Sequence, residues 1–323
     1  MADRVIMYSE AINEAHIQEM ERDPNVVLFG ENVSSSWRGA TKGLKERFGR
    51  ERVRDTPITE TSFIGMGVGA AIRGLRPVVE LMLVDFGLVA MDQILNQMAK
   101  SHYMSGGAVK VPMVLRASYG AGTSSGATHS ESLYSIFAHM PGMKVVLPSN
   151  PYDAKGLLIT AIRDDNPVVF MEHRLLGKTK GPVPEEPYTV PFGVANLVRE
   201  GSDVTVVATG RMVGLAMEAA DDLKKDASVE VLDPRTIVPL DEEAILNSVG
   251  KTGRLVVVDE DYERCGFSAE VSAIVAEKGF NNLKASVYRV ATPNVPLPFN
   301  PTLEKQLLPD KEKIARAIRN VMA

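Results

Sequence analysis

Short apolar runs alternate with helix-like spacing along the first half of the chain. Strands are predicted where valine, leucine, isoleucine and phenylalanine cluster, at 26–29, 77–81, 111–116, 144–147 and 168–171. Helices are predicted between them: 10–22 with Ser9 as its N-terminal cap, 62–73, Asp85 to about 106, and one that Pro151 opens. Because strands separated by helices pair in parallel, this half is predicted to be an α/β layered domain.

The alternation resumes in the second half after a stretch that is rich in proline. Proline removes backbone donors, so Pro182, Pro184, Pro187 and Pro191 indicate a linker. Beyond it we predict strands at 204–208, 229–232, 255–258 and 287–290, the last closing the sheet, and helices at 212–224, 267–278 and 310–321. The resulting division is a domain at 1–180, a linker at 181–192 and a second α/β domain at 193–323.

Composition narrows the classes of function. The 323 residues are 45% hydrophobic and 24% charged, with a formal net charge of -5 and no basic cluster, which argues against binding to nucleic acid or anionic membrane. We find no apolar run of about 18 residues, so no membrane span is expected. The start of the chain lacks the apolar region of a signal peptide, and Cys265 has no second cysteine to pair with. We expect a cytoplasmic protein.

Residues 65–70 fit the glycine pattern of a dinucleotide-binding turn. That motif requires a buried strand before it, whereas the preceding residues 56–61 read Thr-Pro-Ile-Thr-Glu-Thr. We therefore interpret the glycines as allowing a helix to pack closely against another helix or a subunit.

Several segments together resemble the β subunits of thiamine-diphosphate-dependent 2-oxo acid and acetoin dehydrogenases. They lie in order along nearly the whole chain, at 29–33, 55–60, 84–86, 92–94, 103–107, 129–130, 151–157, 161–167, 235–241 and 296–299. The resemblance implies a thiamine-pyrimidine-binding domain with a parallel sheet, followed by a transketolase C-terminal-like α/β domain.

The resemblance also implies partners. In such enzymes the cofactor lies between an α and a β chain, in a heterotetramer of two α and two β chains, and the acyl group passes to lipoyl-lysine of an acyltransferase. The α chain holds the diphosphate through Mg²⁺, and the β chain holds the aminopyrimidine. This sequence contains no Gly-Asp-Gly segment of the kind that binds Mg²⁺ in the wider class. Its absence supports the view that this chain provides only one half of the cofactor site.

Glu60 is the main catalytic candidate. The resemblance implies that its carboxyl group binds the pyrimidine ring nitrogen, and apolar walls from Ile58, Phe63 and Ile64 would help it to hold a proton. The alternative is a favourable charge at a helix start. The resemblance also implies that Phe86 packs on the pyrimidine, and the alternative is ordinary core packing. It implies that Glu31 borders the cofactor pocket, and the alternative is a simple role in a loop.

His129 is the second catalytic candidate. It follows a polar, flexible stretch at 120–128, and the matching family histidine lies near the route of acyl transfer. The alternative is a hydrogen bond that orients the loop. Glu131 departs from the family pattern, in which glutamine is common at this place.

A potassium site is implied by resemblance alone. Its ligands are mainly backbone carbonyls, which suit a large cation. The matching residues are Met113, Ala161, Ile162, Asp164 and Asn166, and the alternative is a helix end whose carbonyls bind water.

The sequence thus predicts the β subunit of an oxidoreductase that is active only with an α subunit. Its substrate is acetoin or a 2-oxo acid such as pyruvate, with several segments most like acetoin-type chains. Two other classes stay open: a single-chain transketolase-like enzyme, and a non-catalytic scaffold paralogue.

Overall fold

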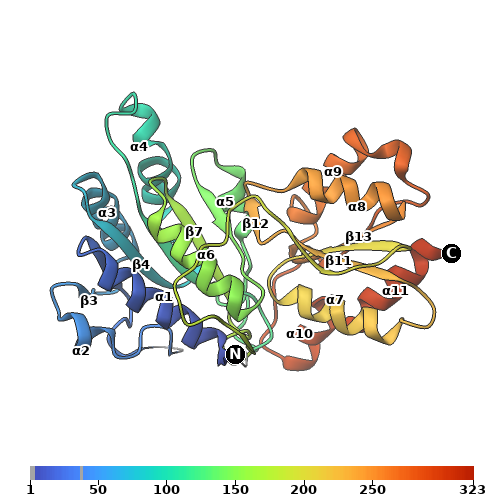
Figure 1. Ribbon diagram of the computed structural model, residues 1–323, viewed down its shortest axis with the longest axis horizontal. Coiled ribbons are helices and arrows are strands. Elements are labelled where there is room, and N and C mark those ends of the chain that lie inside the picture. Colours follow the sequence, from blue (N-terminus) through green and yellow to red (C-terminus); the bar gives the residue numbers. More distant parts are fainter. Residues whose placement is uncertain (1–3, 37–38) are drawn as a thin grey trace. The chain divides into compact units, whose positions relative to one another are not determined.

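The computed structural model describes residues 4–36 and 39–323, and the chain forms two compact units (Figure 1). Unit 1 comprises Met1–Tyr119 and Ile136–Phe192, and unit 2 comprises Gly120–Ser135 and Gly193–Ala323. Within the described residues, no helix is long and apolar enough to cross a membrane.

Unit 1 is built on a parallel sheet. Its strands run in the order β6-β7-β5-β4-β2-β3, with β2 (Val26–Gly30), β3 (Val53–Asp55), β4 (Arg76–Leu83), β5 (Val114–Tyr119), β6 (Lys144–Val146) and β7 (Val168–His173). Both faces of β4 are buried, since Val78 belongs to a hydrophobic core on one face while the next residue, Val79, approaches Gly67 on the other. Burial on both faces explains why these strands read as continuous apolar runs.

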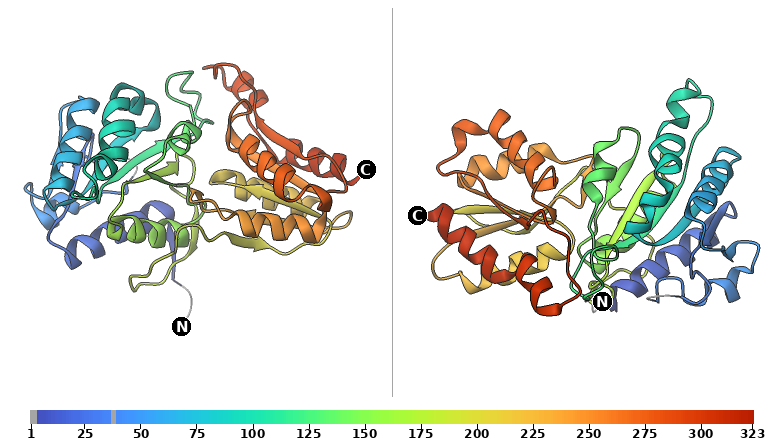
Figure 2. Two further views of the ribbon diagram at one scale, coloured as in Figure 1. Left: turned by 90° about the horizontal axis from the view of Figure 1, so that it is seen from above. Right: turned by 180° about the vertical axis from the view of Figure 1, so that it is seen from behind.

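Helices cover the two faces of this sheet (Figures 1 and 2). The helices α1 (Tyr8–Arg22) and α6 (Pro151–Arg163) share one core with the sheet, and α3 (Glu60–Ile72) packs on β4. The remaining elements are α2 (Leu44–Phe48), α4 (Ala99–Met104), α5 (Tyr134–His139) and the antiparallel pair β1 (Val5–Met7) and β8 (Lys180–Pro182).

Two local predictions in this region were wrong. Ser9 does not cap α1, because the helix already begins at Tyr8, and the Glu10 carboxylate accepts a hydrogen bond from the Met7 N–H at 2.8 Å. The single long helix predicted from Asp85 is instead a 3₁₀ segment, η2 (Val84–Ala90), a π segment, η3 (Gln93–Met98), and α4. Two apolar residues of the predicted helix, Leu88 and Val89, are exposed, so this part of the chain does not bury a continuous apolar face.

The glycine pattern at 65–70 lies inside α3, as the packing interpretation requires. A Cβ on Gly67 would lie 2.7 Å from Val79 and 2.9 Å from Met113, so the glycine lets the helix approach the sheet. A Cβ on Gly65 would lie 2.9 Å from the Gln93 side chain of η3.

The proline-rich stretch packs on unit 1. The Lys155 side chain is fully buried, and its ammonium donates to the carbonyls of Pro184, Glu185 and Glu186 at 2.7, 2.9 and 3.1 Å. Tyr188 stacks on Tyr152 with ring centroids 4.5 Å apart. Proline-rich backbone offers few donors but many acceptors. One buried ammonium group that donates to three of its carbonyls therefore holds this stretch of backbone in place.

Unit 2 contains a five-stranded sheet in the order β14-β13-β10-β11-β9. Its core joins the sheet to α7 (Arg211–Asp222) and α11 (Lys311–Met322), while α8 (Glu242–Thr252) and α9 (Phe267–Lys278) pack on β10 and β13 (Figure 1). The other bounds are β9 (Asn196–Arg199), β10 (Val204–Ala208), β11 (Val229–Asp233), β12 (Thr236–Val238), β13 (Leu255–Tyr262), β14 (Tyr288–Thr292), η4 (Phe280–Asn282) and α10 (Pro301–Leu307). The predicted closing strand is β14, at the sheet edge, whereas the antiparallel edge strand β9 was not predicted.

The close approach of β2 and β4 predicts that a side chain added at Gly30 destabilises the fold. Gly30 has φ +139°, and an added Cβ would lie 2.1 Å from the carbonyl oxygen of Glu80, so Gly30→Ala should lower the free energy of unfolding by at least about 3 kcal/mol. Gly74→Ala is the control, since Gly74 has φ +96° with open space around it, and should cost only about 1 kcal/mol. Urea unfolding measures both; equal costs would contradict the packing described here.

Candidate active site

The strands β2 and β3 end side by side in unit 1, level with the middle of β4. The Gly30 carbonyl accepts a hydrogen bond from the Thr56 N–H at 2.9 Å, and the Glu31 N–H donates to the Glu80 carbonyl at 3.1 Å. These bonds tie the ends of β2 and β3 and the middle of β4 to one another. In parallel α/β sheets, ligands bind at the carboxyl ends of strands.

A cluster of carboxyl groups lies at this place: Glu31, Glu60 and Glu80, here called the glutamate cluster. Glu31 is 3% exposed, and neither carboxyl oxygen has a hydrogen-bond partner among the described residues. Burial, then the charges of Glu60 and Glu80, raises the pKa of Glu31 from its usual 4.5 to about 7. Like charges in a dry site cannot all be ionised, so the cluster retains a proton near neutral pH.

Glu60 is the first residue of α3 and is half-buried. Its predicted apolar surroundings are only partly present, because Phe63 and Ile64 are buried but Ile58 is 78% exposed. The side chain therefore lies at the border between the buried Glu31 and the outside of unit 1.

A buried arginine compensates one member of the cluster, Glu80. The Arg116 guanidinium contacts Glu80 through Nη1 and Glu172 through Nε, and its Nη2 donates to Glu172 Oε2 at 3.0 Å. All three residues are less than 10% exposed. Burial still raises the pKa of Glu80, although the charge of Arg116 acts in the opposite direction. Sequence reasoning missed this triad, whose members come from three different strands.

Phe86 lies next to an irregularity in β4. The register with β5 shifts between Glu80 and Leu83, and Met82 has φ 66°, a conformation that β-branched and bulky residues rarely adopt. The chain then continues into η2, where Phe86 is half-buried. Bulges of this kind re-aim side chains beside functional sites.

His129 belongs to unit 2, together with the rest of residues 120–135. Its side chain is exposed, and its Nδ1 lies 2.9 Å from Thr128 Oγ1. The structure thus brings Glu31 and Glu60 together in unit 1, with Phe86 in the same unit, and places His129 in the other unit.

The two halves match two known domain families. Residues 4–179 match the pyrimidine-binding domain of transketolase, and residues 193–314 match the transketolase C-terminal domain. The chain is 48% identical over 326 residues to the β subunit of acetoin:2,6-dichlorophenolindophenol oxidoreductase from Bacillus subtilis, covering 96% of this chain and 95% of that protein. The chain belongs to the family of acetoin and 2-oxo acid dehydrogenase β subunits.

Other members of this β-subunit family are nearly as similar. The 2-oxoisovalerate dehydrogenase β subunit of Bacillus subtilis is 44% identical, with 98% of each chain covered. The pyruvate dehydrogenase β subunit of Rickettsia felis is 46% identical, again with 98% coverage of both. A solved split-gene transketolase, an inactive β4 tetramer, shares the fold with a TM-score of 0.79, 22% identity and 98% coverage of both chains.

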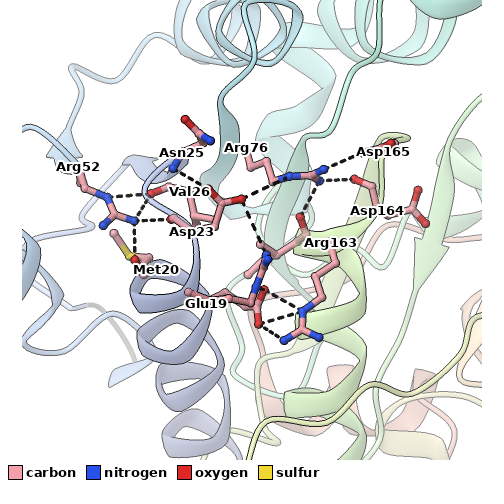
Figure 3. A network of polar contacts seen from close by, with 12 residues as sticks. Glu19, Met20, Asp23, Asn25, Val26, Arg52, Arg76, Arg163, Asp164 and Asp165 are labelled. Atoms are coloured by element: carbon pink, nitrogen blue, oxygen red, sulfur yellow. Dashed lines mark hydrogen bonds and ion pairs between the residues drawn. The ribbon is translucent and has the colours of Figure 1, made fainter.

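Two of the carbonyls predicted to bind potassium, those of Ile162 and Asp164, accept hydrogen bonds from one guanidinium group, that of Arg76 (Figure 3). Arg76 Nη1 donates to the carbonyls of Ile162 at 3.1 Å and Asp164 at 3.0 Å. The Met113 carbonyl accepts from the Val168 N–H at 2.9 Å, and the Ala161 carbonyl from the Asp164 N–H at 3.3 Å.

Side chains around those carbonyls are also engaged. The Asp164 carboxylate accepts hydrogen bonds from the Asn166 N–H at 2.8 Å and from its Nδ2 at 3.0 Å, and it pairs with Lys144. Burial acts to raise the pKa of Asp164, but these bonds hold it below its usual range. A potassium ion here would share its carbonyl ligands with the Arg76 guanidinium. Across residues 4–36 and 39–323, no group of three or more His, Cys, Asp and Glu residues could hold a metal ion.

The raised pKa of Glu31 gives a pH prediction for this β subunit. Because the folded state favours the protonated carboxyl, its contribution to stability is complete below about pH 4.5 and is lost as the pH rises through about 7. Glu31→Gln mimics the protonated form, so its stability relative to wild type should rise between about pH 5 and about pH 8.

Urea unfolding of both proteins at the two pH values measures this difference. Glu51→Gln removes a carboxylate whose side chain is 82% exposed and serves as the control, with no such change expected. A difference between Glu31→Gln and wild type that is the same at both pH values would show that Glu31 ionises normally.

Proposed function

We propose that this chain is the β subunit of a thiamine-diphosphate-dependent dehydrogenase that cleaves acetoin oxidatively or decarboxylates a 2-oxo acid such as pyruvate. The acyl group is transferred to lipoyl-lysine of a partner acyltransferase. The observation that carries the proposal is the glutamate cluster, in which the buried Glu31 carboxyl, crowded by Glu60 and Glu80, has its pKa raised to about 7 at the end of a parallel strand.

The residues present fit the aminopyrimidine half of the cofactor. Within residues 4–36 and 39–323, the buried oxygens of Glu31 have no hydrogen-bond partner. A carboxyl that keeps its proton near neutral pH can donate to or accept from a ring nitrogen. When bound, thiamine diphosphate supplies the nucleophilic carbon that attacks the substrate carbonyl. We assign Glu60 to the hydrogen bond with the pyrimidine, Glu31 to the retention of a proton beside it, and Phe86 to packing on the ring.

The site is completed by an α subunit that carries Mg²⁺ and the diphosphate. The absence of a Gly-Asp-Gly segment from this sequence supports that division. So does the solved split-gene transketolase, whose β chains form an inactive tetramer. Unit 1 also exposes apolar side chains on and around α3 and η2 that suit burial against such a partner, at Ile58, Met66, Leu88 and Val89.

Acetoin is the first substrate to test, because the acetoin enzyme of Bacillus subtilis is 48% identical to this chain, against 46% for the pyruvate enzyme. A cytoplasmic location stays a prediction. Potassium at the Ile162 and Asp164 carbonyls also stays a prediction, and a higher melting temperature in potassium than in sodium chloride of equal ionic strength would support it.

Glu60→Gln tests the assignment of the catalytic carboxyl group. An amide cannot exchange a proton with the pyrimidine, so turnover of the complex with its α subunit should fall at least about 100-fold, with assembly intact. Glu46→Gln, a first-turn glutamate of α2, is the matched control and should keep wild-type turnover. Acetoin, pyruvate and branched-chain 2-oxo acids are each assayed, and assembly is followed by size-exclusion chromatography. Full turnover of Glu60→Gln would contradict the assignment.

A further inference from the structure

Residues 120–135, here called the His129 segment, are held by unit 2 in an unusual way. Between Gly120 and Gly126 the segment has no side chain larger than threonine, so burial of apolar surface contributes little to fixing it. Gly120, Gly122 and Gly126 all have positive φ, as does Ser124 with φ 55°. A non-glycine residue in that conformation persists only where its surroundings impose it.

Glu304 of α10 provides that restraint. Its carboxylate is 3% exposed and accepts hydrogen bonds from the Gly122 N–H at 3.0 Å and the Ser124 N–H at 3.0 and 3.2 Å. The Ser124 hydroxyl donates to it at 3.1 Å. Backbone N–H groups that point together in this way form an anion-binding concavity, and here the chain's own carboxylate fills it.

Further contacts hold the same end of the segment. The Ala121 N–H donates to Glu260 at 2.7 Å, and the Ala121 side chain packs with Leu297 and Leu308. A Cβ on Gly126 would lie 2.6 Å from the Phe299 ring, so this ring lies directly against the backbone. In Figure 2 the His129 segment is drawn in green, and residues 297–308, which contact it, are drawn in red.

The other end of the segment is fixed to β13. The buried Tyr134 hydroxyl donates to Asp259 and accepts from the Asp261 N–H at 3.0 Å. Glu131, the residue that departs from the family pattern, accepts from the Tyr262 hydroxyl at 3.2 Å. His129 lies between these two anchored ends, exposed to the outside.

We propose that Glu304 is a positioning residue for His129, which it places for acyl transfer to the lipoyl group by fixing the backbone at Gly122 and Ser124. The inference rests on the proposed function and on the predicted place of His129 beside the route of acyl transfer. In that transfer the substrate-derived carbon is oxidised by two electrons and bonds to one lipoyl sulfur, the S–S bond breaks, and the second sulfur takes up a proton and leaves as a thiol. It assigns to the C-terminal domain a direct influence on that step.

Glu304→Gln is the test, because the amide places an NH₂ group against N–H donors without changing the shape of the side chain. Glu312→Gln is the matched control, an exposed first-turn glutamate of the next helix, α11. Hydrogen exchange at residues 120–130 is measured on each protein, and melting temperature checks folding. Each variant, complexed with the α subunit, is then assayed with a lipoyl domain and with dichlorophenolindophenol as acceptor.

We expect faster exchange at residues 120–130 and a lipoyl-dependent rate that falls about tenfold more than the dye-dependent rate. Glu304→Asp, which keeps the charge but is shorter, should lie between Glu304→Gln and wild type and replaces it if that variant does not fold. Unchanged exchange, or equal loss of both rates, would overturn the proposal. If the wild-type complex turns over none of the substrates, the proposed function fails, while the exchange result still decides whether Glu304 fixes the segment.

Discussion

The crowding of carboxyl groups where β2 and β3 end, level with the middle of β4, is the constraint on which the site depends. Gly30 lets β2 approach β4, and this approach brings Glu31 close to Glu80. One buried cation, Arg116, compensates Glu80 and Glu172, whereas Glu31 has no hydrogen-bond partner in the part of the chain that the structure describes. The cluster therefore keeps a proton near neutral pH, which suits a group that must exchange protons with a heteroaromatic ring.

Elements whose apolar run or spacing is regular were predictable from the sequence. The predicted helix at 267–278 is α9 with the same bounds, and 26–29 lies within β2. Elements that depend on distant partners were not predicted. Strand β8 exists because it pairs with β1, and η2 and η3 replace part of the single helix predicted over residues 85–106. Local periodicity carries no information about such tertiary contacts.

The same distinction applies to the site. Glu31 and Glu60 were found because the segments around them resemble family segments. The strand carboxylates Glu80 and Glu172 carry no local signal in the sequence, because their role depends on the ion pairs that they form with Arg116 from another strand. The bonds from Gly122 to Glu304 span 182 positions of sequence. The His129 segment belongs to unit 2 although it lies far from the rest of that unit in sequence, so a division of the chain by composition does not reveal it.

The central claim is that this chain provides one half of a cofactor site: the carboxyl groups for the pyrimidine, with the diphosphate held elsewhere. Calorimetric titration of thiamine diphosphate with Mg²⁺ into the chain alone, and into its mixture with an α subunit, tests it most directly. The account predicts binding in the mixture and none to the chain alone. Tight Mg²⁺-dependent binding by the chain alone would contradict it and would indicate a self-sufficient thiamine enzyme.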